Sequence, residues 1–303
     1  RTSTVPVKAV DGINLAIEEK EILGIAGESG CGKSTLANGL IRMIFPPAYI
    51  AGGRVLFHGR DLLKMSEEEL RQIRWKKITF SPQASMNSLN PVIKILSQIQ
   101  DAMEDHDFKR PKEEIKIIAS NLMKNVGLSP HILDGYACEL SGGMKQRVII
   151  SMGMVLSPEL IIADEPTSAL DVVVQRGVLE LLAELKERQG TSVLLISHDL
   201  GILAEVVDRL AIIYAGKILE IQDVYEIFNE PLNPYTQGLI SSIPTFDKQE
   251  IPKSIPGLPP NLMNPPSGCR FHPRCPKAMS ICREKEPELK EIDSGKIVAC
   301  HLF

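Results

Sequence analysis

A glycine-rich loop between a short apolar segment and a helical segment constrains this chain more than any other feature. Residues 27–34 read Gly-Glu-Ser-Gly-Cys-Gly-Lys-Ser and fit the pattern G-x-x-x-x-G-K-[ST]. Residues 22–26 predict a buried strand, and residues 35–41 predict a helix. A strand, a glycine loop and a helix in this order direct several backbone N–H groups at one anion. The loop therefore predicts a nucleoside triphosphate site in an α/β fold.

The loop divides the expected nucleotide contacts between backbone and side chains. Lys33 can reach the β- and γ-phosphates, and the Ser34 hydroxyl can ligate Mg2+. The other expected contacts come from Gly27, Ser29, Gly30, Cys31, Gly32 and Thr35. By itself the pattern indicates an NTPase and no more.

A second apolar run, residues 160–163, ends in Asp164 and Glu165. Such a run suits a central parallel strand, and its C-terminal end is where ligands bind in open α/β sheets. We expect Asp164 to hold Mg2+, usually through water, and Glu165 to orient or polarise the attacking water. The alternative is a strand that simply stops at two solvated acids.

The segment Ser141, Gly142, Gly143 is typical of a helix start. Ser141 is a good N-cap, the glycines let an anion approach the backbone, and the positive end of the helix dipole favours that anion. Taken alone, the segment is an ordinary capped helix. Residues 140–147, Leu-Ser-Gly-Gly-Met-Lys-Gln-Arg, nevertheless resemble the signature of the ATP-binding-cassette (ABC) ATPases.

The resemblance extends to three further positions and implies a catalytic scheme. Gln83 matches the glutamine loop, which touches Mg2+ and water, Asp171 matches the loop at the dimer interface, and His198 matches the histidine at the γ-phosphate. In the family, two cassettes enclose two ATP molecules head to tail. The implied site has two sides: one cassette contributes Lys33, Ser34, Thr35, Gln83, Asp164, Glu165 and His198, and the other contributes Ser141, Gly142 and Gly143. The implied catalytic residues are Glu165, His198 and Gln83.

Hydrophobic periodicity predicts the organisation of the rest of the cassette. Residues 7–10, 13–17 and 53–57 predict a small antiparallel sheet, and residues 66–77 predict a helix capped by Ser66. Residues from about 90 to 156 predict a helical subdomain. A helix over 172–188 ends at a Gly190 turn, and alternating elements to about residue 228 predict a parallel sheet.

Composition changes near residue 230 and divides the chain into two expected domains. Nine prolines between Pro231 and Pro266 exclude long helices and central strands. We expect an α/β P-loop NTPase (ABC ATPase) core over residues 1–230, with antiparallel β and helical subdomains. A proline-rich, cysteine-containing extension over residues 231–303 follows it.

Four of the six cysteines lie in this extension, at Cys269, Cys275, Cys282 and Cys300. Two disulfides are not expected in a reducing compartment, whereas four thiolates in a small polar tail suggest a metal centre. The tail lacks the tight Cys pairs of structural zinc sites, and Cys275 precedes a proline as in ferredoxin-type sites. We favour a [4Fe–4S] cluster, with zinc or free thiols as alternatives.

The extension narrows the resemblance to the ATPases of oligopeptide and dipeptide importers, through residues 233–239, 255–260 and 268–276. Asn233 and Val174 are modest departures from that family's pattern. The resemblance implies a peripheral subunit at the cytoplasmic face of the membrane, importing peptides or related solutes such as nickel. The implied partners are a second ABC ATPase subunit, as a heterodimer, two transmembrane permease subunits that touch residues 84–89, and an extracellular solute-binding protein.

Bulk properties bear on the competing functions. The net charge of −4 argues against a nucleic-acid coat, and neither an apolar run of 18 residues nor a signal peptide is evident. The resemblance also implies an aromatic side chain, in an early loop, on which the adenine stacks. No aromatic residue precedes Phe45, so we expect this side chain to be missing or to lie upstream of Arg1. A soluble ABC ATPase of the DNA-repair or translation type is the main alternative; an iron–sulfur sensor with a degenerate cassette is a weaker one.

Overall fold

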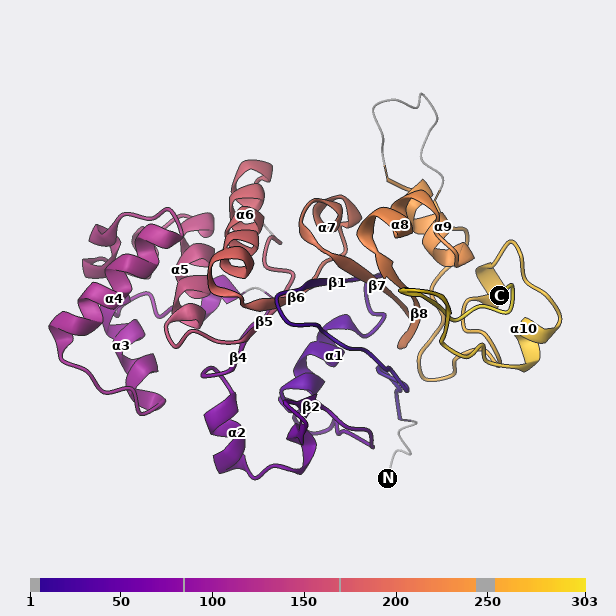
Figure 1. Cartoon of the computed structure of the whole chain (residues 1–303), viewed down its shortest axis with the longest axis horizontal. Helices are drawn as coiled ribbons and strands as arrows, with labels where there is room; N and C mark the ends of the chain where they lie inside the picture. The colour runs from indigo at the N-terminus through magenta and orange to yellow at the C-terminus, as the bar shows by residue number, and fades with distance from the viewer. Residues whose placement is uncertain (1–5, 84, 169, 244–253) are drawn as a thin grey trace. The chain divides into compact units, whose positions relative to one another are not determined.

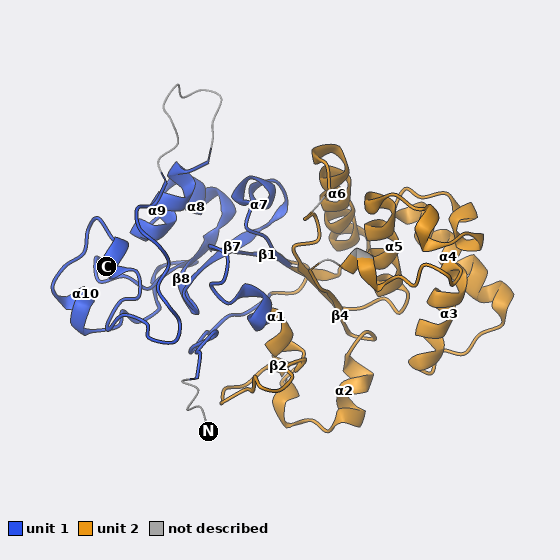
Figure 2. Cartoon of the chain, turned by 180° about the vertical axis from the view of Figure 1, so that it is seen from behind, with its two compact units in different colours: residues 1–17, 23–36, 195–303 blue, residues 18–22, 37–194 orange. Residues whose placement is uncertain are grey.

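The computed structural model describes residues 6–83, 85–168, 170–243 and 254–303. The chain forms two compact units, coloured blue and orange in Figure 2. Unit 1 comprises residues 1–17, 23–36 and 195–303, and unit 2 comprises residues 18–22 and 37–194. Ala84, in the expected permease-facing segment, and Ala169, beside the expected interface loop, lie outside the described residues.

Unit 1 is built on a mixed sheet. Strand β1 (Ile22–Ala26) runs parallel to β7 (Arg209–Tyr214), with Leu23 opposite Arg209. Both strands are almost fully buried, which is why their sequences are continuously apolar. Beyond β7 follow β8 (Lys217–Asp223), β10 (Lys296–Val298) and β9 (Lys290–Asp293), each antiparallel to its neighbour.

The expectation of a parallel sheet up to about residue 228 is therefore wrong at one place, because β7 and β8 form a hairpin. Ala215 and Gly216 join the two strands, with φ angles of 48° and 81°. Two consecutive residues with positive φ are typical of the tight turn that suits the twist of a hairpin.

The helices of unit 1 are short. They are α7 (Leu200–Val206), α8 (Val224–Asn229), α9 (Pro234–Ser241), α10 (Ile281–Glu284) and the start of α1 (Lys33–Leu40). Helix α9 begins at an Asn233 cap with proline in its first turn, and it lasts eight residues. This length agrees with the prediction that the proline-rich stretch excludes long helices.

Unit 2 contains parallel strands and a group of helices (Figure 1). Strand β4 (Ile78–Ser81) lies beside β5 (Leu160–Asp164), which is followed in the sheet by β6 (Ser192–Ile196). Helices α3 (Ile95–Asp105), α4 (Lys112–Asn125) and α5 (Gly142–Met154) contact one another in sequence order, which confirms the helical prediction for residues 90–156.

Capping explains where two other helices of unit 2 begin and end. The side chain of Ser66 accepts a hydrogen bond from the Glu69 N–H, and the Glu69 carboxylate accepts one from the Ser66 N–H. This capping box starts α2 (Glu67–Ile73) at the predicted residue. Helix α6 (Val172–Gln189) ends at Gly190, whose φ of 69° is left-handed.

The predicted antiparallel sheet near the N-terminus is reduced to two short strands. Only β2 (Leu56–Phe57) and β3 (Arg60–Asp61) pair, and residues 6–20 contain no strand. The Asp61 side chain accepts from the Val55 N–H, so the donor that would lengthen the ladder is already used. Val7 is 52% exposed, so the alternation around it does not mark a buried face.

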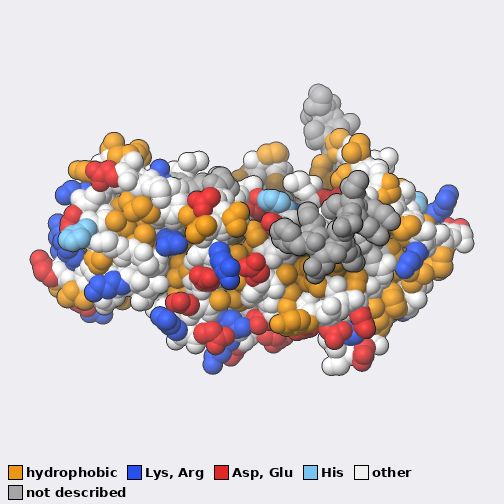
Figure 3. All heavy atoms as spheres, turned by 90° about the horizontal axis from the view of Figure 1, so that it is seen from above, with side chains coloured by type: hydrophobic (Ala, Val, Ile, Leu, Met, Phe, Trp, Pro, Cys, Tyr) orange, Lys and Arg blue, Asp and Glu red, His pale blue; other side chains and the backbone are white. Residues whose placement is uncertain are grey.

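No helix among the described residues is long and apolar enough to cross a membrane. On the face drawn in Figure 3, basic and acidic side chains are interspersed. This mixture agrees with the small net charge of the whole chain.

Candidate functional site

The glycine loop joins β1 to α1 in unit 1, as the sequence predicts. Gly32 has a φ of 109°, and a Cβ there would lie 2.1 Å from the carbonyl oxygen of Ala9. A side chain is therefore excluded by both backbone conformation and space. The conformation of the glycine loop is thus fixed both by its own glycines and by the N-terminal segment packed against it.

Lys33, at the start of α1, is buried and turned back over the loop. Its ammonium group donates to the carbonyl oxygens of Gly27 (2.7 Å) and Glu28 (3.1 Å), and lies 3.7 Å from the Cys31 sulfur. Ser34 is half-buried and Thr35 is exposed, and Ser29 and Gly30 lie exposed at the tip of the loop. The loop therefore presents a cation together with the N-terminus of a helix, which suits a phosphate chain.

His198 belongs to the same unit and follows β6. The preceding residue, Ser197, donates its N–H to the carbonyl oxygen of Ile25 in β1 at 3.1 Å. His198 itself is exposed, and Asp199 then caps α7 through the N–H groups of Gly201 and Ile202. The histidine therefore emerges from the sheet next to the strand that leads into the glycine loop.

Unit 2 brings together two of the predicted catalytic residues. Strands β4 and β5 are parallel with Ser81 opposite Ala163, so Gln83 and Glu165 leave the sheet at the same edge. The Gln83 side-chain amide donates to the Glu165 carboxylate at 3.0 Å. Glu165 has a φ of 48°, a conformation that costs a non-glycine residue free energy and is often found at functional sites.

Asp164 is the last residue of β5 and is 2% exposed. The C-terminal end of a buried parallel strand is where ligands bind in open α/β sheets, and the role of Asp164 as a Mg2+ ligand stays a prediction. Ser168 donates its hydroxyl to the Glu165 carbonyl, and Asp171 caps α6 by accepting from the Val174 N–H. The local turn after β5 is therefore held by its own side chains.

The signature segment begins α5, also in unit 2. The Ser141 side chain accepts from the Met144 N–H, and Ser141 and Gly142 are exposed while Gly143 is buried. A Cβ on Gly143 would lie 2.2 Å from a methyl group of Val174. Val174, one of the two departures from the importer family's pattern, therefore packs directly against the signature glycine.

The helix that carries the signature is also tied to the glutamine loop. The Ser85 hydroxyl, two residues after Gln83, donates to the buried side chain of Gln146 at 3.2 Å. Sequence reasoning gave Gln146 no role beyond the helix pattern. The bond connects a segment beside the water-handling residues to the helix that begins at Ser141.

The prediction of a metal cluster in the tail is not supported by the arrangement of its side chains. Across the four described stretches of chain, no three His, Cys, Asp or Glu side chains form a group that could hold a metal ion. The thiols are nonetheless near one another. Burial raises the pKa of Cys269 to about 11, and the thiols of Cys282, Cys275 and Cys300 act in the same direction. All six cysteines are unpaired thiols.

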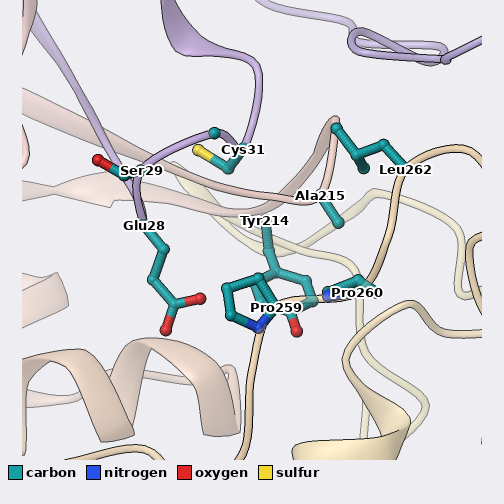
Figure 4. Close-up of a pocket in the computed structure, with 9 residues that line it drawn as sticks. Glu28, Ser29, Cys31, Tyr214, Ala215, Pro259, Pro260 and Leu262 are labelled. Atoms are coloured by element: carbon teal, nitrogen blue, oxygen red, sulfur yellow. The ribbon is translucent and has the colours of Figure 1, made fainter.

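Sequence reasoning missed two residues that hold the glycine loop from the tail side. Arg274 forms two bonds to the Glu28 carboxylate, at 2.7 and 2.9 Å, and the Tyr235 hydroxyl accepts from the Glu28 N–H at 3.1 Å. In Figure 4, loop residues face Tyr214 and the prolines Pro259 and Pro260 around a small hollow. No local pattern signals contacts between residues more than 200 positions apart.

The strand, glycine loop, helix and buried acidic strand end define a P-loop nucleoside triphosphatase. The family comparison narrows this class: the ABC transporter model matches residues 10–168. The chain belongs to the ABC transporter family, and residues 219–282 match the model of the oligopeptide/dipeptide transporter C-terminal region.

Curated relatives match over nearly the whole chain. The dipeptide transport ATP-binding protein DppD of Caldanaerobacter subterraneus subsp. tengcongensis is 46% identical over 98% of this chain and 92% of its own length. The oligopeptide transport ATP-binding protein OppD of Bacillus subtilis is 43% identical over 98% of this chain and 84% of its own.

Solved structures show the same fold. The dimeric post-hydrolysis state of the ATP-binding cassette MJ0796, bound to ADP and Pi, aligns with a TM-score of 0.63 and 28% identity. The alignment covers 71% of this chain and 90% of that one. CbiO1 from Clostridium perfringens aligns with a TM-score of 0.62, over 73% of this chain and 84% of that one.

Proposed function

We propose that this chain is the ATP-hydrolysing subunit of an ABC importer that takes up dipeptides, oligopeptides or related solutes such as nickel. The observation that carries the proposal is that one chain combines an intact phosphate loop with the oligopeptide/dipeptide transporter C-terminal region. The relatives named as peptide transport ATP-binding proteins support the solute class. A DNA-repair or translation role has no comparable support.

The hydrolytic roles are assigned residue by residue. The loop backbone, Lys33 and Thr35 bind the phosphates of ATP, while Ser34, Gln83 and Asp164 hold Mg2+. Glu165 activates the attacking water, with Gln83 and His198 orienting the water and the γ-phosphate. The Gln83–Glu165 bond supports the pairing of these two residues in one step. Catalysis then consists mostly of positioning and charge stabilisation.

A second cassette completes the site in this proposal. Ser141, Gly142 and Gly143 of one cassette cover the ATP held by the loop of the other, and Asp171 lies at the interface. ATP favours the closed dimer because each nucleotide then contacts both subunits, and hydrolysis removes that difference in affinity. The dimeric state of the similar cassette MJ0796 supports this arrangement, and the importer family implies a different chain as the second subunit.

The remaining partners are two membrane permease subunits and an extracellular solute-binding protein. The chain would lie at the cytoplasmic face of the membrane as a peripheral subunit, with the segment around residues 85–89 against a permease. Within the chain, residues 1–230 would form the nucleotide-binding domain, with its helical subdomain at about 90–156, and residues 231–303 the extension. The match of the C-terminal region over residues 219–282 supports an extension of this kind.

The four tail cysteines, Cys269, Cys275, Cys282 and Cys300, would hold a [4Fe–4S] cluster, with zinc as the alternative. The Cys269 N–H donates to the Cys282 carbonyl at 2.8 Å, which ties two ligand segments together. A bound metal would supply the positive charge that lets the four thiols lose their protons.

Reconstitution tests the transport function. The chain is co-purified with its permease subunits and partner cassette, placed in lipid vesicles, and assayed for ATP turnover with and without a peptide-loaded binding protein. Stimulation by peptide supports the proposal, and the Glu165→Gln complex serves as the inactive control. Full-rate hydrolysis by a strictly monomeric chain would refute the two-cassette scheme.

A further inference from the structure

We propose that Arg274 and Tyr235, both in the C-terminal extension, are positioning residues for the phosphate loop and set the orientation of Lys33 through Glu28. The inference builds on the proposed ATPase function. It adds a role for the extension in nucleotide binding. All the residues involved belong to unit 1.

Glu28 is the point at which the extension holds the loop. Its side chain receives the two N–H groups of the Arg274 fork, and its backbone N–H donates to the Tyr235 hydroxyl. Its carbonyl oxygen accepts from the Lys33 ammonium at 3.1 Å. The orientation of the Glu28 peptide therefore determines where one of the acceptors of Lys33 lies.

Arg274 is also held in place by partners other than Glu28. Its side chain is 6% exposed, and its guanidinium also donates to the carbonyl oxygens of Pro256 (2.9 Å) and Ile255 (3.3 Å). A planar fork paired with a carboxylate fixes direction as well as distance, which a lysine ammonium does not.

Tyr235 is anchored in an aromatic group with Tyr214 and Phe271. The centroid of the Tyr235 ring lies 4.6 Å from that of Tyr214 and 5.1 Å from that of Phe271. The Tyr235 side chain is fully buried. Its hydroxyl cannot move away from the loop without disturbing this packing. The start of the helix that carries Tyr235 is in turn fixed by the buried Glu220 carboxylate, which accepts from the N–H groups of Leu232 and Asn233.

The predicted consequence is a loss of ATP affinity with little loss of turnover. Arg274 and Tyr235 touch Glu28, the residue that positions Lys33, and neither is among the residues proposed to activate the water. A freed Glu28 would let Lys33 sample other orientations and weaken its contact with the phosphates. Loss of an interaction of this kind raises KM while kcat is maintained.

The experiment uses the full chain in its transporter complex, with Glu28→Gln, Arg274→Gln, the double variant, and Tyr235→Phe. ATP affinity, KM and kcat are measured for each. We expect each of Glu28→Gln and Arg274→Gln to raise KM about tenfold with kcat within about threefold, and the double variant to be no worse than either single variant. Losses that simply add in the double variant, or kcat falling as much as KM rises, would overturn the inference.

Lys296→Gln is the matched control. It breaks an ion pair to Glu226 at 2.7 Å that also links the C-terminal extension to the rest of unit 1, without touching the loop. If it raises KM as much as Arg274→Gln does, the effect is general destabilisation of the extension and the inference fails. Arg274→Lys, which keeps the charge but loses the fork, is expected to restore only part of the affinity.

Hydrogen exchange separates this inference from the proposed function. In the nucleotide-free chain, Tyr235→Phe removes the acceptor of the Glu28 N–H and Arg274→Gln releases the Glu28 side chain. Exchange at residues 27–33 should therefore become faster in both variants and remain unchanged in Lys296→Gln. Unchanged exchange in the first two refutes the positioning role, whatever the ATPase assays show. A parent transporter complex that fails to hydrolyse ATP refutes the proposed function alone.

Discussion

The side-chain amide of Gln83 donates a 3.0 Å hydrogen bond to the carboxylate of Glu165, across the ends of two parallel strands. The bond joins the Gln83 amide to the Oε2 atom of the carboxylate. A hydrogen bond to a carboxylate restricts the direction in which it points, and a carboxylate can accept a proton from water. The geometry supports the proposed roles of Glu165 as the water-activating group and of Gln83 as the residue that orients it.

Replacing Glu165 by Gln is expected to reduce ATP turnover by about 100- to 10,000-fold, because the side chain can no longer accept a proton. ATP affinity should be retained, since the amide oxygen can still accept from Gln83. A stopped assay for phosphate release and a nucleotide titration measure the two quantities. Glu180→Gln, on the exposed face of α6, is the control, and a Glu165→Gln rate near that of the parent would contradict the assignment.

Replacing Lys33 by Ala is expected to weaken ATP binding by roughly 10- to 100-fold, the range set by losing a charge-assisted bond to phosphate. Fluorescence titration with a labelled ATP analogue measures the change. Lys64→Ala removes a lysine from a surface position and should leave affinity intact. Equal affinity of the Lys33 variant and the parent would argue against the loop as the nucleotide site.

Replacing Gly32 by Ala is expected to lower the free energy of unfolding by about 1–3 kcal/mol, the usual range for a strained backbone position. The added Cβ meets the Ala9 carbonyl oxygen, so either the loop or the N-terminal segment must shift. Gly39→Ala is the contrast, because its Cβ would meet nothing within 4 Å and alanine favours the helix. Urea denaturation compares the two, and a Gly32 variant as stable as the Gly39 variant would contradict the steric account.

Local signals in the sequence predicted those parts of the fold that local chemistry determines. The apolar run of β1, the Ser66 capping box and the Gly190 helix end each depend on neighbouring residues, and each lies where the pattern placed it. The predicted pairing of a glutamine loop with an acidic strand end rested on the family resemblance. In the structure, Gln83 and Glu165 are bonded to each other.

Features that depend on distant contacts could not be predicted in the same way. The turn at Ala215 and Gly216 lacks the Asn-Gly or Asp-Gly signal of a hairpin. Strand β9 is exposed along its length and carries three charged residues, so no apolar pattern marks it as part of a sheet. The Arg274–Glu28 pair joins residues 246 positions apart, and nothing near either residue indicates the other.

Replacing Cys269 and Cys275 together by Ser is expected to remove bound metal from anaerobically purified protein. Elemental analysis for iron and zinc, with the visible absorption spectrum, measures the loss. Cys138→Ser, an exposed cysteine outside the tail, is the control. Metal content unchanged in the double variant would rule out these ligands, and zinc without broad visible absorption in the parent would replace the cluster by a zinc site.

Acid is expected to destabilise the fold partly through Glu159. Bonds from Lys77 and His58 lower the pKa of this carboxyl below its ordinary value of 4.5. A carboxyl with a lower pKa in the folded than in the unfolded chain stabilises the fold above the unfolded value, and this contribution is lost as pH falls through the folded value. Urea midpoints measured from pH 3 to 6 should therefore separate Glu159→Gln from the parent above about pH 4.5, and the two curves should converge at lower pH. A constant offset at every pH would mean that Glu159 acts through packing rather than charge.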